Sequence, residues 1–165
     1  PPYLVILSGD GEGGLGTLGA LVIASAAASF LSSYAWGRFA DHSSRQVLIV
    51  AGVVGALAMA AAIGASLTGL TATVWAMPVV LFVLMIAHHG VRQGRSTYLV
   101  DIANDENRAA YAATANTLIG GLLLISGAIG GALSFLGPMA ALGGFAVMAL
   151  IGSGVALGLK EAEGA

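Results

Sequence analysis

Five long apolar stretches alternate with short polar connections along the chain. They cover residues 15–36, 47–67, 77–103, 109–133 and 139–159. A helix needs about 20 apolar residues to cross the hydrocarbon core of a bilayer, and each stretch reaches that length. The pattern therefore predicts an all-α integral membrane protein with five transmembrane helices.

Composition agrees with this class and narrows the chemistry. The 165 residues are 58% hydrophobic and 8% charged, whereas soluble domains average about 25% charged residues. Cysteine is absent from the sequence, which excludes a disulfide or a thiolate metal site within it. The sequence also has no phosphate-binding loop of the Gly-x-x-x-x-Gly-Lys-Ser type and no cluster of basic residues of the kind that binds nucleic acid. We therefore expect neither ATP-driven transport nor nucleic-acid binding.

The third stretch carries the most informative polar residues. Residues 74–87 supply only fourteen mostly apolar positions, too few to cross a bilayer. The span must therefore include His88 and His89, and we expect it to include Arg92 and Arg95. At about 100° per residue, His88, Arg92 and Arg95 form one stripe, with His89 beside it. Ionisable side chains at this depth almost always face a bundle interior or a wet cavity, so we predict that these four line a substrate or ion pathway.

An alternative places this helix at residues 70–89. Arg92 and Arg95 would then lie in a cytoplasmic loop and set the topology. In the pathway interpretation, the two arginines keep their charge and attract an anionic substrate group or a carboxylate from another part of the protein. His88 or His89 would couple transport to protons, because histidine titrates near neutral pH. Asn116 on the fourth stretch is a weaker pathway candidate.

The charges of the connections predict how the chain crosses the membrane. Basic residues lie at alternate connections and helix ends, whereas the opposite connections carry Asp10 and Glu12. By the positive-inside rule, the basic side and the C-terminus face the cytoplasm, and we expect the plasma (inner) membrane. The basic residues are Arg38, Arg45, Arg92, Arg95, Arg108 and Lys160.

Polar residues near the fourth stretch predict its start. We expect Asp101 to form a structural ion pair at the membrane edge with Arg108, or with Arg38. Asn104 is the expected N-cap of the fourth helix. The two acidic residues after it would lie in the first turn, where the helix dipole favours anions.

Small residues predict where helices approach one another. Serines on one face of the first stretch allow close packing, which we favour over a substrate-lining role. Small-xxx-small spacings on the second stretch and a small polar face on the fourth also predict close contacts. These sets are Ser25, Ser29 and Ser32; Ala51/Gly55 and Ala56/Ala60; and Asn116, Gly120, Gly127 and Gly131.

The connection at residues 37–46 (GRFADHSSRQ) resembles the loop motif of the major facilitator superfamily. That motif reads roughly Gly-x-Leu-Ala-Asp-Arg-x-Gly-Arg-Arg. Gly37, Ala40, Asp41 and Arg45 match it, while other positions of the loop depart from it. The matching residues include the glycine of the turn and one charge of each sign.

The third stretch is similar to that family's fourth helix and its symmetry mate, the tenth, because Gln93 and Gly94 are followed by an acidic turn and Arg108. The resemblance implies that the chain is the C-terminal part, helices eight to twelve, of a twelve-helix carrier. It implies secondary transport of a small solute by alternating access, coupled to an ion or proton gradient, with the substrate between two halves near the midplane. The missing N-terminal half would be the protein partner, and we expect no enzymatic activity, cofactor or metal.

The loop also has a physical interpretation. Gly37 permits a tight turn, Asp41 can accept hydrogen bonds from helix N-terminal amides, and Arg45 can meet a carboxylate across the interface. We expect these residues to form a cytoplasmic gating loop that latches the two halves in one conformation. The simpler alternative is a solvated loop that only sets the topology.

Two other classes compete with a transporter. A non-transporting membrane scaffold or assembly subunit would be held by small-residue faces, but packing alone does not need intramembrane arginines. An intramembrane metalloenzyme would use His88 and His89, yet adjacent helical residues point about 100° apart rather than toward one ion. The chain opens on PPYLVILSG, which is too short to span, and we interpret it as the end of an earlier helix.

Overall fold

A computed structural model describes residues 14–73, 75–104 and 106–161 of the chain. Asp10, Glu12 and Asp105, which enter the topology and capping predictions, lie outside these described residues. The described helices are α2 (Gly14–Ala40), α3 (Ser44–Leu67), α4 (Ala76–Ile102), α5 (Arg108–Ser134) and α6 (Pro138–Leu157), with a short 3-10 turn, η1 (Leu70–Ala72), before α4.

The described part of the chain forms an all-α bundle of five helices, each long and apolar enough to cross a membrane. Many large apolar side chains are exposed on its outer surface, including Phe30, Leu124 and Ile151. In water such a surface would aggregate, whereas lipid tails solvate it. The chain is therefore a multi-span membrane protein in contact with the bilayer, as the apolar pattern predicts.

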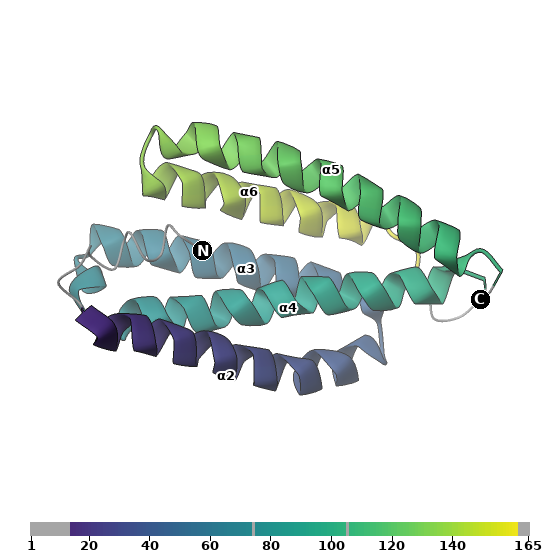
Figure 1. Cartoon of the computed structure of the whole chain (residues 1–165), viewed down its shortest axis with the longest axis horizontal. Coiled ribbons are helices and arrows are strands. Elements are labelled where there is room, and N and C mark those ends of the chain that lie inside the picture. The colour runs from purple at the N-terminus through teal and green to yellow at the C-terminus, as the bar shows by residue number, and fades with distance from the viewer. Residues whose placement is uncertain (1–13, 74, 105, 162–165) are drawn as a thin grey trace.

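Helices α3 and α4 form the centre of the bundle (Figure 1). Helix α2 packs on α4, α6 packs on α3, and α5 lies beyond α6. Successive helices run in opposite directions, so α2 and α4 lie parallel to each other. The α2–α3 and α4–α5 connections and the C-terminal end of α6 lie at one end of the bundle, on the right in Figure 1.

Helix α4 is continuous from Ala76 to Ile102. It therefore carries His88, His89, Arg92 and Arg95, and the alternative in which the helix ends at His89 is wrong. Pro78 lies in the first turn, where its missing N–H costs no intrahelical hydrogen bond. Fourteen apolar residues were too few for a span, and the helix gains its length by including the polar residues.

The first connection differs from the prediction. Helix α2 continues past Gly37 to Ala40, because the Asp41 N–H donates to the Gly37 carbonyl at 3.1 Å and extends the helical pattern. Ser43, not Asp41, is the N-cap of α3, since its hydroxyl accepts from the Gln46 N–H at 3.1 Å. Serine is a preferred N-cap residue, so the local chemistry is ordinary but lies two residues later than expected.

The start of α5 also differs. The helix begins at Arg108 after Asn107, whose side chain makes no capping hydrogen bond. Asn104 is therefore not the N-cap, and Glu106 lies outside the first turn. The Asn107 N–H donates to the Asn104 carbonyl at 3.0 Å, which closes a turn before the helix starts.

Two glycines let α4 approach its neighbours closely. A Cβ atom at Gly90 would lie 2.6 Å from Cε2 of Trp36 and 2.8 Å from Cβ of Ala51, and one at Gly94 would lie 2.9 Å from Cγ1 of Val47. The Trp36 indole N–H donates to the Ile86 carbonyl at 2.8 Å across the same contact. These distances leave no room for a side chain on this face of α4.

The predicted small-residue faces have different outcomes. Ala51 and Gly55 are buried against α4, so the prediction is confirmed for this pair, whereas Ala60 of the second pair is exposed. On α5, the face with Asn116, Gly120, Gly127 and Gly131 is exposed, and the contact with α6 is made by Gly130 against Phe145 instead.

We predict that Gly90→Ala lowers the free energy of unfolding by about 1–3 kcal/mol, because the added methyl group overpacks the contact with Trp36 and Ala51. Reversible unfolding of the purified protein in mixed detergent micelles measures this change. The matched control is Gly120→Ala, where nothing lies within 4 Å of the new Cβ. Equal destabilisation by both variants would mean that α4 does not depend on this contact.

Candidate functional site

A polar cavity of about 410 Å³ lies between α2 and α4. Its lining side chains are polar or charged, although both helices are candidate membrane spans. The lining residues are Ser29, Ser32 and Ser33 from α2, and His89, Arg92, Gln93 and Ser96 from α4.

The cavity begins near the middle of both helices. His89 is the central residue of α4 (Ala76–Ile102), and Ser29 lies two residues beyond the centre of α2 (Gly14–Ala40). With a rise of about 1.5 Å per residue, Arg92 lies about 4.5 Å farther along α4 than His89. The polar groups therefore lie at a depth where an ionisable side chain requires a polar or wet surrounding.

A hydrogen bond joins the two helices inside the cavity. Ser29 Oγ and His89 Nε2 are 2.9 Å apart, and Ser29 Oγ also donates to the Ser25 carbonyl at 2.9 Å. A hydroxyl has a single proton to donate, so both bonds form together when Nε2 carries a proton and donates to Ser29. This contact holds the His89 ring toward α2, away from the lipid-facing side of α4.

Ser32 is the most enclosed polar group of the cavity. Its residue is 1% exposed, and Oγ has no hydrogen-bond partner among the described residues. The neighbouring serines on α2 behave differently, because Ser29 donates to the Ser25 carbonyl and Ser33 donates to the Ser29 carbonyl at 3.0 Å. The Ser32 hydroxyl therefore has unused hydrogen-bonding capacity beside the cavity.

The cavity has a positive electrostatic character. Arg92 is the permanently charged residue of its lining, and none of the seven lining residues carries a carboxylate. A guanidinium stays protonated at all physiological pH values. In surroundings of low dielectric constant its field is stronger than in water, so the cavity favours an anion.

The predicted pathway residues do not share one cavity. Arg95 and Asn116 come together in a second cavity of about 240 Å³ between α4 and α5, which Ser96 also lines. Arg108 is a further residue of that lining. His88 is exposed, with its ring centroid 5.9 Å from that of His89, and it lines neither of these cavities.

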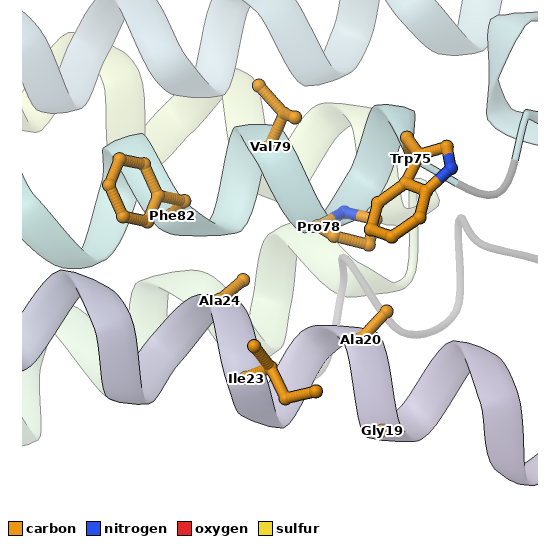
Figure 2. Close-up of a pocket in the computed structure, with 8 residues that line it drawn as sticks. All are labelled: Gly19, Ala20, Ile23, Ala24, Trp75, Pro78, Val79 and Phe82. Carbon is orange, nitrogen blue, oxygen red and sulfur yellow. The ribbon is translucent and has the colours of Figure 1, made fainter.

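An apolar cavity of about 450 Å³ lies farther toward the start of α2 and α4 (Figure 2). Small residues of α2, including Gly19 and Ala20, face Pro78 and Phe82 of α4 and its N-cap residue Trp75 there. The lining positions of α4 recur fourteen residues later at the polar cavity, so the two cavities lie along one face of α4 about 21 Å apart. One face of this helix thus changes from apolar to polar along its length.

A cluster at the other end of the bundle involves the predicted gating loop. Arg45 forms an ion pair with Glu161 at 3.0 Å and donates to the Leu157 and Ala156 carbonyls at 2.6 and 3.3 Å. It thereby satisfies carbonyls at the C-terminal end of α6, where a helix favours a cation. Ser43 donates to the Glu161 carboxylate as well.

The other edge residues also have partners from distant parts of the chain. Asp101 accepts a hydrogen bond from Ser44 Oγ at 2.9 Å, a partner from α3 that the sequence analysis did not name. The Tyr98 hydroxyl donates to the Lys160 carbonyl at 3.3 Å. Asp41 is exposed, and Gly37 lies within α2. Contacts from α3 and α4 therefore hold the segment that follows α6.

Several of these residues were missed at the level of sequence. The stripe through His89, Gln93 and Ser96 has the same i, i+4, i+7 spacing as the predicted stripe through His88, and it holds three polar residues inside the apolar helix. Counting both stripes would have identified the second. No local signal indicated that Glu161 pairs with Arg45, because that contact joins distant elements.

Comparisons of the chain with family models, with curated proteins and with solved structures find no match. Within the described parts of the chain, no three side chains of metal-ligating type come together. The site is thus defined by its geometry, namely a cationic, hydroxyl-rich cavity at mid-depth of two candidate spans.

We predict that the contact of the C-terminal segment with Ser43 and Arg45 depends on pH. Hydrogen bonds from Ser43 and from Arg45 hold the pKa of Glu161 below its usual value of 4.5. A lowered pKa in the folded state means that the contact is present at neutral pH and is lost as the pH falls through that lowered value.

Amide hydrogen exchange of residues 157–161, corrected for intrinsic rates, measures this contact. At pH 7, Glu161→Gln should exchange faster than the parent, and the difference should shrink and then vanish as the pH falls through the lowered pKa of Glu161. Glu106→Gln, an exposed acid at the same end of the bundle, is the control and should match the parent. If Glu161→Gln matches the parent at pH 7, the ion pair does not hold the segment.

Proposed function

We propose that this chain is part of a secondary active transporter that moves a small solute by alternating access. The observation that carries the proposal is the position of Arg92 and His89 at mid-depth of a candidate span, on a cavity that serines of α2 also line. Placing a guanidinium there is costly, so such residues usually mark a substrate or ion path. A bundle that serves only as a scaffold does not need this cavity.

The resemblance to the major facilitator superfamily supports the same function. In this proposal the chain corresponds to helices eight to twelve of a twelve-helix carrier, with α2 as the eighth helix and α4 as the tenth. The cavity between α2 and α4 would face the other half of the carrier. The work is transport rather than catalysis, and we propose no cofactor or metal.

The end of the bundle that carries Arg38, Arg45, Arg108 and Lys160 is proposed to be cytoplasmic. These residues gather at the connections on one end, as positive-inside topology requires. The membrane would then be the plasma (inner) membrane. The residues of the predicted gating loop lie at this end. We propose that the cluster of Arg45 with Glu161 takes part in closing the cytoplasmic side of the carrier.

A membrane scaffold or assembly subunit is the second candidate. The outward face of α5 favours it, because nothing lies within 4 Å of a Cβ built at Gly120, Gly127 or Gly131. Such a face could receive a helix of another protein. In the transporter proposal, the remaining helices of the same carrier cover this face.

Thiol labelling from each side of the membrane distinguishes the two functions. The sequence contains no cysteine, so Ser33→Cys places a single thiol in the polar cavity within this part of the protein. Val147→Cys on the exposed side of α6 is the control, because it lies near the middle of a candidate span and outside the cavity. The full-length protein is tested in sealed vesicles with a membrane-impermeant maleimide.

Alternating access predicts that Ser33→Cys reacts from both sides of the membrane. Trapping one conformation should abolish the reaction from one side only. Val147→Cys should react from neither side, because lipid surrounds it. Reaction of Ser33→Cys from one side in every condition, or from neither side, would contradict the transporter and favour the scaffold.

A further inference from the structure

We propose that the polar cavity between α2 and α4 is an oxyanion-binding site, and that the transported solute carries a compact oxyanionic group. The site stands on its own geometry, whereas the identification of its ligand as a transported solute rests on the proposed function. The group would contact Arg92 and the Ser32 hydroxyl together.

The charge of the lining selects the ligand. Arg92 offers guanidinium N–H donors in a planar fork that matches an oxyanion, and no lining residue offers a carboxylate that would repel one. A cation would meet Arg92 without any compensating acid in this lining. An apolar solute would offer no hydrogen bond to the Ser32 hydroxyl or to the Gln93 amide.

Ser32 is independent evidence for a ligand. Its hydroxyl is buried and has no partner among the described residues, although Ser29 and Ser33 on the same helix each donate to the carbonyl four residues earlier. A buried hydroxyl without a hydrogen bond lowers stability, so the site is incomplete when empty. An oxyanion beside Arg92 would accept that unused proton.

The depth of the site favours a solute over a lipid headgroup. His89 lies at the centre of α4, and the lining ends seven residues later at Ser96, whereas lipid headgroups begin about 15 Å from the midplane. The neighbouring cavity of Figure 2 is lined by apolar residues such as Phe82 and Trp75 and offers no donor set for an oxyanion. It therefore supplies a location for a control variant.

Equilibrium binding of radiolabelled sulfate to the purified full-length protein in neutral detergent tests the site, because sulfate keeps its charge across the useful pH range. Ionic strength is held constant with chloride. The parent should bind sulfate saturably, and unlabelled phosphate should compete. Addition of micelles containing phosphatidic acid should not compete, because a lipid headgroup does not reach mid-depth.

Three variants and two controls test whether Arg92 and Ser32 bind the sulfate. Arg92→Gln should weaken sulfate binding by about tenfold or more, and Arg92→Lys should weaken it less, because the charge remains but the fork is lost. Ser32→Ala should weaken binding by about two- to tenfold. Arg38→Gln, an exposed arginine of α2 outside the cavity, and Phe82→Ala in the apolar cavity should bind as the parent does.

A second readout separates a ligand-binding role of Ser32 from a structural one. Without sulfate, Ser32→Ala should unfold at the same or a higher temperature than the parent, because it removes a buried hydroxyl that has no partner. Sulfate should raise the unfolding temperature of the parent more than that of Ser32→Ala. A structural serine would instead lower the unfolding temperature with or without sulfate.

The proposal is overturned if the parent binds no sulfate, if Ser32→Ala and Arg92→Lys bind like the parent, or if Arg38→Gln weakens binding as much as Arg92→Gln. Competition by phosphatidic acid micelles would mean that the site binds a lipid headgroup and not a solute.

The oxyanion site and the transport function can fail separately. Labelling of Ser33→Cys from both sides without sulfate binding would contradict the oxyanion site alone. Sulfate binding without two-sided labelling removes transport alone.

Discussion

The close contact of α4 with α2 and α3 at Gly90 and Gly94 fixes the positions of the polar side chains on α4. A methyl group at either glycine would overlap Trp36, Ala51 or Val47, so this face lies against its neighbours without any side chain between. His89, Gln93 and Ser96 then lie along one edge of the contact, beside α2. The indole N–H of Trp36 on α2 donates a hydrogen bond to the Ile86 carbonyl of α4 and so holds the same contact together.

Placing a charged side chain in lipid costs free energy, so the position of Arg92 on α4 determines what its neighbours must be. Arg92 lies within the α4 span and cannot lose its charge. The surface of α2 opposite Arg92 must therefore be polar enough to solvate that charge. Helix α2 presents serines there, and one of them binds His89 directly. Toward the start of both helices, the same face of α4 meets small and apolar residues, as Figure 2 shows. Within the α2–α4 pair, the cavity lining is thus apolar toward the start of both helices and polar beyond their middle.

Patterns within one helix were predictable from sequence, whereas pairings between helices were not. The five spans follow from apolar length, and the shortage of apolar residues before His88 correctly placed both arginines on α4. The Gly90–Gly94 spacing and the His89 stripe are also patterns within one helix, so both are visible in the sequence. Pairing of Ser29 with His89, or of Arg45 with Glu161, depends on α2 lying beside α4 and α6 beside α3, which no local pattern specifies. The starts of α3 and α5 were misplaced because several polar residues competed for each cap.

Water accessibility along α4 shows whether its polar stripe faces a wet cavity or lipid. Spin labels placed singly at residues 88–96 of the full-length protein in bilayers would be compared for collisions with a water-soluble nickel complex and with oxygen. We expect high nickel accessibility at positions 89, 92, 93 and 96, and restricted motion with little accessibility to either reagent at positions 90 and 94. High oxygen and low nickel accessibility at positions 89, 92 and 93 would contradict it, because the stripe would then face lipid.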